Sequence, residues 1–333
     1  MNKIAPHPDK TPIRFDAGPG TRRGPDFIIG GAPKCGTTSL HFILDQHPAI
    51  SLPQDEVHFF DADDPIAHPD FLSVQGGALQ WWDPRPGAQA NQDWYAGRFP
   101  RPVPGGLVGE DSTTYLMSEL AARRIAAQLP DARLVFMLRH PVQRAYSQYW
   151  HLIKTSRAAE SFETAILRYP HILLGSGYAA GLQRFISALG RDRVHVCLFE
   201  DFRADIQGCV DGVTHFLGAD PMRVDPERAW FNRTRYPARP ALHRMANRIG
   251  RHLVRGRYRQ HMGGSATLAR RVENKLHYWW FAHVSPRFMT AGRPPPMAAA
   301  TQAYLEQHLS ARNAGLSTLL DRDLPSIWPG MRC

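Results

Sequence analysis

No stretch of this sequence approaches the roughly 18 uninterrupted apolar residues that indicate a transmembrane helix. The first residues also lack the apolar core of a secretory signal peptide, and are rich in proline, glycine and charge instead. We therefore expect a flexible N-terminal arm at 1–25 and a cytoplasmic protein, whose contact with membranes would be peripheral and at the inner face.

Cysteine is scarce as well. The four cysteines stand at positions 35, 197, 209 and 333 and share no spacing typical of metal ligands. Without a secretion signal we expect a reducing compartment, in which disulfides do not form. Cys197 lies in an apolar run and is predicted to be a small buried hydrophobic residue, whereas Cys35 is either a loop filler or a reactive thiol.

Acidic residues are almost absent from one long segment. Residues 228–293 contain fifteen arginines and lysines and one acid, Glu273, which gives a net charge of +14, whereas the 25 basic and 29 acidic residues elsewhere give −4. Such a local surplus indicates a specific anionic partner. The segment either binds an anionic membrane, where "HYWWF" (277–281) would sit at the interface, or lines an acceptor cleft. We expect no nucleic-acid partner, because no known nucleic-acid-binding motif accompanies the charge.

Short apolar runs alternate with helical patterns from residue 26 to about 217, without internal repeats. Continuous apolar runs of this kind predict a parallel sheet covered by helices on both faces, with the ligand at the carboxyl ends of the strands. We expect one α/β domain over 26–328 that includes the basic segment. The expected strands are 26–32, 49–53, 107–110, 133–139 and 193–202, and the expected helices are 37–46, 141–156, 178–190, 204–218 and 299–328.

The stretch "IIGGAPKCGTTSL" (28–40) joins the first expected strand to the first helix. Gly31 and Gly36 have the spacing of a nucleotide-binding P-loop, but Thr37 stands where its lysine belongs and the cation is Lys34. A phosphate-like anion could bind here, because the loop offers backbone N–H groups and the helix N-terminus, and hydroxyl groups come directly after it. No expected strand ends in the aspartate that would hold Mg²⁺, so a P-loop kinase is the less favoured alternative.

Three motifs, in this order, resemble those of sulfotransferases that use 3′-phosphoadenosine 5′-phosphosulfate (PAPS), in the heparan sulfate 3-O- and N-sulfotransferase branch. "APKCGTTSL" (32–40) is similar to the 5′-phosphosulfate loop, "LPQDEVHFFD" (52–61) to the acceptor-side motif and "LRHPVQRAYSQY" (138–149) to the 3′-phosphate motif. Two further elements, "VGEDSTTYL" (108–116) and "AGRPPPM" (291–297), also match, so the resemblance covers about 26–217 and 290–328.

This resemblance implies the sulfotransferase fold and transfer of a sulfuryl group from PAPS to a hydroxyl or amine of a carbohydrate, glycolipid or similar acceptor, without a metal. The implied catalytic residues are Lys34, Glu56, His58 and Asp61, with Glu56 as general base and Lys34 stabilising the leaving phosphate. The implied nucleotide-binding residues are Lys34, Cys35, Gly36, Thr37, Thr38, Ser39, Arg139, Ser147, Gly292 and Arg293.

Read from the residues alone, some of these roles stay open. Glu56 follows a short strand and could face the loop, or it could be a solvated turn carboxylate. His58 could carry a second proton, orient the acceptor or pack as a polar residue. Arg139 ends an apolar strand, where a buried guanidinium needs an anionic partner.

The chain departs from the family's pattern at three positions. Lysines usual in the family are replaced by Asp55 and Asp111, and the lysine before Gly292 is replaced by Ala291. Two aspartates in place of two lysines lower the net charge of the acceptor side by about four units, which argues against a heparan-like polyanionic acceptor at these positions.

Overall fold

The structure is a computed structural model that describes residues 24–69, 71–81, 89–100, 103–225, 236–237, 240–248 and 294–333, with a few single positions between 272 and 290. The arm predicted at 1–25 lies outside these residues except for its last two positions. Most of the basic segment 228–293, and with it Gly292 and Arg293, also lies outside them.

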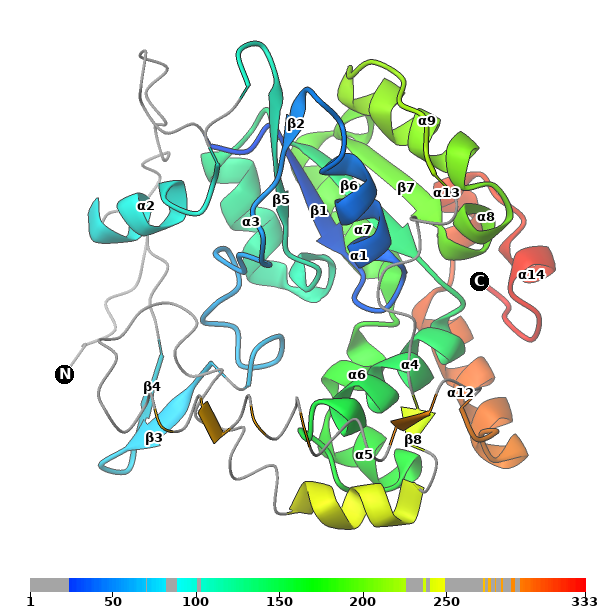
Figure 1. The fold of residues 1–333 in the computed structure, drawn as a ribbon. Helices are drawn as coiled ribbons and strands as arrows, with labels where there is room; N and C mark the ends of the chain where they lie inside the picture. Colours follow the sequence, from blue (N-terminus) through cyan, green and yellow to red (C-terminus); the bar gives the residue numbers. More distant parts are fainter. Residues whose placement is uncertain are drawn as a thin grey trace.

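A five-stranded parallel sheet forms the centre of the molecule, with strand order β2-β5-β1-β6-β7 (Figure 1). Its strands are β1 (Phe27–Gly31), β2 (Ile50–Ser51), β5 (Leu107–Asp111), β6 (Arg133–Leu138) and β7 (Val194–Leu198). All five residues of β1 and the last five of β6 are buried, as expected for strands covered on both faces. The predicted α/β open sheet is confirmed.

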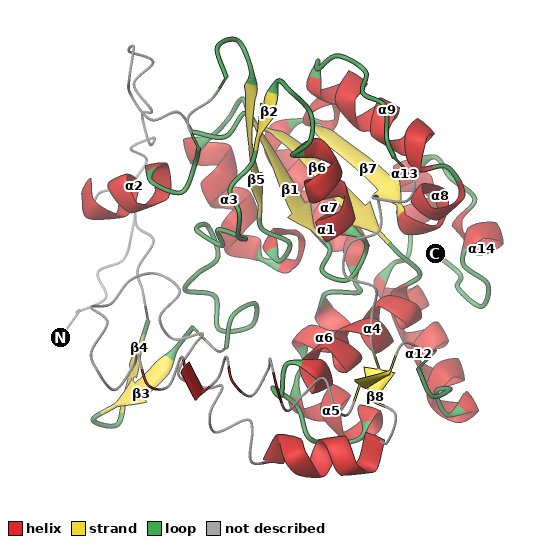
Figure 2. Cartoon of the chain, in the orientation of Figure 1, coloured by secondary structure: helices red, strands yellow, loops and turns green. Residues whose placement is uncertain are grey.

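Helices cover both faces of this sheet (Figure 2). In front lie α1 (Thr37–Leu44), α8 (Phe199–Ala204) and α9 (Ile206–Leu217), and behind lie α3 (Glu119–Gln128) and α7 (Tyr178–Leu189). The prediction that Cys197 is buried is confirmed, since 6% of it is exposed between these layers.

A second group of helices lies below the carboxyl ends of the strands in Figure 1. It consists of α4 (Pro141–Lys154), α5 (Phe162–Arg168), α6 (His171–Leu174) and α12 (Ala299–Arg312), with helical residues 240–248 beside them. Pro141 occupies the first turn of α4, where its missing N–H costs nothing. Smaller elements are α2 (Gln89–Ala96), the 3₁₀ turns η1 (Tyr115–Met117) and η2 (Arg191–Arg193), the hairpin β3 (Ser73–Gln75) and β4 (Ala78–Gln80), and the pair β8 (Tyr236–Pro237) and β9 (Met289–Thr290).

Two expectations about elements are wrong. The strand expected at 193–202 ends at Leu198, where the acidic Glu200 and Asp201 favour the first turn of α8. The single helix expected at 299–328 is three: α12, then α13 (Leu316–Leu320) and α14 (Leu324–Ile327). Gly315 and Asp321, with φ of 80° and 53°, turn the chain into the left-handed region and break it there.

Among the described residues, the helices are too short or too polar to cross a membrane.

Candidate active site

The loop after β1 is shaped by its two glycines. Gly31 has a φ of 138°, and a Cβ there would lie 2.5 Å from the carbonyl oxygen of Thr113. Gly36 has a φ of 96° at the start of α1, and a Cβ there would lie 2.9 Å from the ring of Phe199. Only glycine fits both conditions. The spacing noted in the sequence therefore reflects a turn packed against η1 on one side and α8 on the other.

Lys34 lies at the wall of a cavity and has a left-handed backbone, with a φ of 71°. Its Nζ is 3.4 Å from Nδ1 of His151 on α4, and its carbonyl oxygen accepts a hydrogen bond of 3.4 Å from Arg139. Burial and the nearby cations of α4 lower the pKa of Lys34 to about 8, although Glu56 acts in the opposite direction. A lysine in this state is mostly charged at neutral pH and loses its charge as the pH rises through about 8.

Helix α4 contacts the loop after β1 through Arg144. Arg144 is 1% exposed, and its guanidinium donates hydrogen bonds of 2.9 Å to the carbonyl oxygen of Pro33 and 2.8 Å to that of Ile172. Arg144, Gln148 and His151 all line the cavity. Their i, i+4, i+7 spacing places them on one face of the helix. The sequence interpretation missed this face, although the spacing of polar residues in an otherwise buried helix could have revealed it.

Across the cavity, Glu56 and His58 form a close pair. Glu56 Oε2 is 2.6 Å from His58 Nε2, and both carboxylate oxygens are 3.2 Å from Thr113 Oγ1. Like Lys34, His58 has a left-handed backbone, with a φ of 51°. Strained backbone at non-glycine residues is concentrated at functional sites, so its occurrence on both walls supports a functional cavity.

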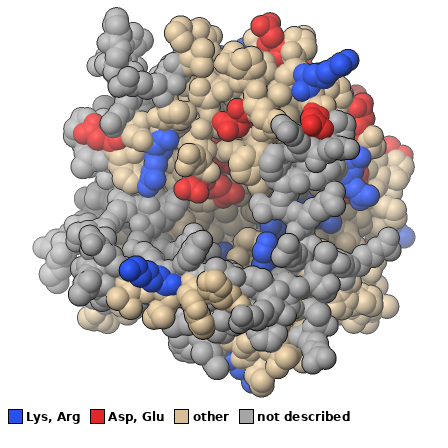
Figure 3. Space-filling model, in the orientation of Figure 1, with Lys and Arg blue, Asp and Glu red and all other residues tan. Residues whose placement is uncertain are grey.

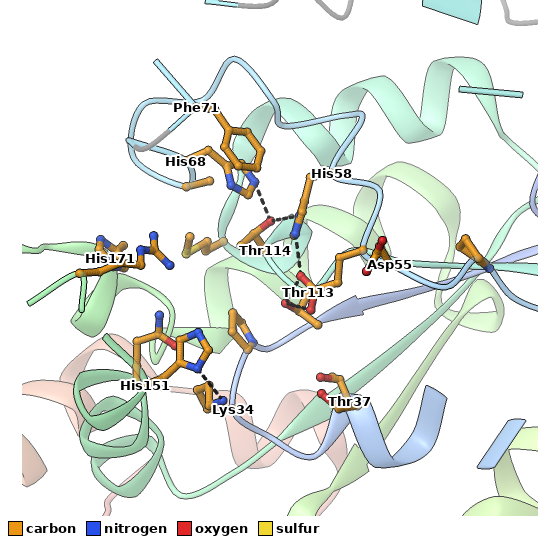
Figure 4. Close-up of a pocket in the computed structure, with 18 of the residues that line it drawn as sticks. Lys34, Thr37, Asp55, His58, His68, Phe71, Thr113, Thr114, His151 and His171 are labelled. Atoms are coloured by element: carbon orange, nitrogen blue, oxygen red, sulfur yellow. Dashed lines mark hydrogen bonds and ion pairs between the residues drawn. The ribbon is translucent and has the colours of Figure 1, made fainter. Parts of the chain in front are cut away.

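Behind this pair lies a network centred on Thr114 (Figure 4). The Thr114 hydroxyl is 2.5 Å from Asp61 Oδ2, 3.1 Å from His58 Nδ1 and 3.0 Å from His68 Nε2. The ring of His68 also lies 3.0 Å from Asp61 Oδ1. His58, Asp61 and His68 offer ligand atoms within 4.8 Å of one another and could hold a metal ion, but the Thr114 hydroxyl already bonds to all three.

The protonation states of Glu56, His58, Asp61 and His68 depend on burial and on their contacts with one another. Burial alone would lower the pKa of His58, but Glu56 raises it above the ordinary value for histidine. Burial alone would raise the pKa of Glu56 and of Asp61, but His58 and His68 respectively lower them. Burial lowers the pKa of His68 itself. Glu56 and Asp61 are therefore ionised, His58 tends to be protonated and His68 to be neutral.

These walls enclose a cavity of about 870 Å³ at the carboxyl ends of the strands. In Figure 3, acidic side chains face Lys and Arg side chains across a hollow. The charged and histidine residues that line the cavity are Lys34, Asp55, Glu56, His58, His68, Arg98, Arg144, His151, Lys154, Arg157 and His171. On the opposite wall from Glu56, the Lys34 charge lowers the pKa of His151 well below the usual range, which leaves that ring neutral.

Most catalytic residues implied by the sequence come together here. Lys34, Glu56 and His58 line the cavity, and Asp61 is fully buried behind His58. Of the nucleotide-binding residues, Thr37 and Thr38 also line it. Gly36, Ser39, Arg139 and Ser147 are not among its described lining residues.

Arg139 lies beside the loop, where it bonds to the carbonyl oxygen of Lys34. The Arg139 guanidinium packs 4.8 Å from the Phe199 ring centroid, and Ser147 is buried on α4. Cys35 points away from the cavity, with its Sγ 3.9 Å from the Tyr178 hydroxyl. Cys35 is fully buried, and burial raises the pKa of its thiol to about 11, which favours the loop filler over the reactive thiol.

The two aspartates that replace family lysines differ in position. Asp55 is exposed and lines the cavity. Asp111 is 5% exposed, and its Oδ2 is paired with Nδ1 of His41 on α1 at 3.2 Å. Burial raises the pKa of Asp111 to about 6. The expectation that both aspartates face the acceptor is wrong for Asp111, because a histidine on α1 takes the place of the acceptor as its partner.

Comparison with known proteins places these motifs in a family. Residues 24–262 match the model of the sulfotransferase domain family. The chain is 28% identical over 221 residues to human bifunctional heparan sulfate N-deacetylase/N-sulfotransferase 2, a match that covers 60% of this chain and 22% of that protein. It is 31% identical over 153 residues to mouse heparan sulfate glucosamine 3-O-sulfotransferase 6, covering 46% of this chain and 38% of that protein.

The chain thus spans about a fifth and about two fifths of the lengths of these two relatives. Among solved structures, a sulfotransferase from Alicyclobacillus acidocaldarius is 32% identical, with a TM-score of 0.47, over 62% of this chain and 88% of that one.

Proposed function

Because the chain belongs to the sulfotransferase domain family, we propose that it transfers a sulfuryl group from PAPS to a hydroxyl or amine of an acceptor. One observation carries the proposal. Residues 32–36, which we call the anion loop and which include Lys34, face the pair of Glu56 and His58 across one cavity (Figure 4). In-line transfer requires a group that stabilises the leaving phosphate on one side and a base on the other.

The loop side fits the donor. The N-terminus of α1 and the hydroxyl groups of Thr37 and Thr38 can hold the 5′-phosphosulfate, as helix N-termini do for other anions. Lys34 then stabilises negative charge that develops on the phosphate oxygen as its bond to sulfur breaks. Arg139, which bonds to the loop, and Ser147 on α4 remain our proposed contacts to the 3′-phosphate.

The Glu56 side fits the acceptor. Glu56 accepts the proton of the attacking hydroxyl or amine, and His58, in the form in which its Nε2 is unprotonated, shares it across their 2.6 Å contact. We propose a carbohydrate or glycolipid acceptor, which the heparan sulfate relatives support. Asp55 at the cavity wall makes that part of the site less favourable for a polyanion than the family's lysine would.

We further propose that the basic segment contacts an anionic membrane surface. Leu242 and Met245, within helical residues 240–248, are 38% and 59% exposed. Trp279 is 52% exposed in the same segment. Exposed apolar side chains among arginines are typical of interfacial segments, in which the apolar groups enter the headgroup region and the cations bind lipid phosphates.

The decisive experiment combines transfer and binding. Labelled PAPS with carbohydrate, glycolipid and phenolic acceptors should give labelled product, and adenosine 3′,5′-bisphosphate should raise the melting temperature without Mg²⁺. A ligand at 100 times its Kd stabilises the folded state by about 2.7 kcal/mol, enough for a shift of several degrees. Glu56→Gln should lose at least about 100-fold in turnover but keep this thermal shift.

Protection by ATP–Mg²⁺ alone would instead favour the P-loop kinase alternative. Full transfer activity in Glu56→Gln would show that another group is the base.

A further inference from the structure

We propose that Thr114, together with His68, is a positioning residue that fixes the proton of His58 on Nδ1, so that the Nε2 facing Glu56 is the atom that exchanges protons. This inference rests on the proposed sulfuryl transfer for its kinetic consequences, but the placement of the proton can be measured without that reaction.

A count of donors and acceptors at the Thr114 hydroxyl leads to this assignment. A hydroxyl has one proton to donate and lone pairs that accept. Its shortest contact, 2.5 Å, is to Asp61 Oδ2, and a fully buried ionised carboxylate can only accept. The single proton of Thr114 therefore goes to Asp61. His58 Nδ1, 3.1 Å from this hydroxyl, must then donate to it, and His68 Nε2 carries a proton that Thr114 and Asp61 Oδ1, each 3.0 Å away, can both accept.

His68 completes the arrangement from the far side. Its ring stacks on Phe71 with centroids 4.2 Å apart and planes within 5°, and it is 6% exposed. This packing holds Nε2 toward Thr114 and places it 3.0 Å from Asp61 Oδ1. A donor at this point prevents the Thr114 hydroxyl from turning its proton toward a histidine. His68 is absent from the family motifs recognised in the sequence, and its place became apparent only in the fold.

The fixed Nδ1 proton has a direct consequence for Glu56. When His58 is neutral, its Nε2 carries a lone pair aimed at the Glu56 carboxylate 2.6 Å away, which is repulsive. The pair of Glu56 and His58 therefore has a high affinity for a proton. During transfer, the acceptor O–H bond breaks and its proton enters this pair. The acceptor oxygen bonds to sulfur as the bond from sulfur to the phosphate oxygen breaks, and adenosine 3′,5′-bisphosphate leaves.

Other charged groups act on the pair from several elements. Asp61 and His68 lie on its own loop, Glu110 and Asp111 at the end of β5, Lys34 on the anion loop and His41 on α1. A Thr114 substitution leaves all six in place. A change in the titration of the pair in such a variant therefore reports the lost hydroxyl, together with the hydrogen bond that it donates to Asp61.

The test is Thr114→Val, which keeps the shape but removes the hydroxyl, with Thr114→Ser as the matched control. In ¹⁵N NMR of the imidazoles, above the titration of His58, the wild type and Thr114→Ser should show the Nδ1–H tautomer of His58. Thr114→Val should show the Nε2–H tautomer, which can donate to Glu56. With a neutral histidine bonded to Glu56, the acidic limb of kcat/KM should move to lower pH. Turnover on the plateau should fall about 10- to 100-fold, with KM for PAPS within about twofold.

The Nδ1–H tautomer in Thr114→Val, or an unshifted pH profile, would overturn the proposal. Should Thr114→Val not fold, Thr114→Ala offers a second route, since its smaller side chain also lacks the hydroxyl. It should shift the tautomer in the same direction, and an unchanged His58 would again overturn the proposal. A wild type that transfers no sulfuryl group would contradict the proposed function, while the tautomer measurement would still decide this inference.

Discussion

At the scale of single residues, the two walls of the cavity depend on side chains whose protonation is displaced from its usual range. Lys34 is the clearest case, because its pKa of about 8 lies close to working pH. The shift comes first from burial, which penalises the ammonium ion, and then from the cations of α4. A leaving phosphate needs the charged form of this lysine.

The pH dependence of kcat/KM should follow from this state. Lys34 is charged below its pKa of about 8 and neutral above it, so kcat/KM should fall as pH rises through about 8. Lys34→Arg should keep some activity and lose this alkaline limb, because arginine stays charged. Lys34→Ala should lose about 10²- to 10³-fold at all pH values. An alkaline limb that persists in Lys34→Arg would assign the limb to another group.

Which residues could be found from the sequence depended on whether they lie in a contiguous motif. Lys34, Glu56 and His58 do, and the fold brings them to one cavity. Thr114 lies in the matching stretch 108–116 and His68 lies in none, but the role of neither could be predicted, because it arises from a contact between segments 46 positions apart. No local spacing encodes such a contact.

At the scale of elements, the strands and most helices could be predicted because buried parallel strands read as continuous apolar runs. The C-terminal stretch was misread as one helix because its apolar periodicity continues across the breaks at Gly315 and Asp321. These breaks let α14 place Trp328 against the core. The Trp328 indole donates a 2.9 Å hydrogen bond to Glu200 Oε2, and Glu200 Oε1 accepts from the backbone N–H of His140.

The C-terminal elements should therefore stabilise the start of α4. Trp328 is fully buried, so Trp328→Ala should reduce the free energy of unfolding by about 3–5 kcal/mol. Trp328→Phe, which keeps much of the volume but loses the hydrogen bond, should lose less. Urea unfolding followed by circular dichroism measures both. Equal losses would mean that the hydrogen bond to Glu200, and not packing, accounts for the stability.

At the scale of the whole molecule, charge is distributed unevenly, and the basic segment holds the entire surplus. The proposed membrane contact predicts co-sedimentation with anionic vesicles at low salt, which weakens as salt is added. Trp279→Ser should weaken binding. Tyr304→Ser, which changes an aromatic residue 59% exposed on α12, outside the segment, is the matched control and should not. Equal binding to neutral vesicles, or no binding at low salt, would contradict the contact.

The stretch between β2 and β5 begins and ends at neighbouring points of the sheet. Ile50 pairs with Leu107 and Ser51 with Val108, so the chain leaves and re-enters the sheet through adjacent strands. Within that excursion lie the lining residues from Pro53 to Arg98, including Glu56, whereas the anion loop lies before it. Closed excursions of this kind tolerate insertion and replacement. Replacement of this stretch by that of a relative would therefore change most of the acceptor wall at once, provided that Thr113 and Thr114, which follow β5 and bind Glu56 and His58, are kept.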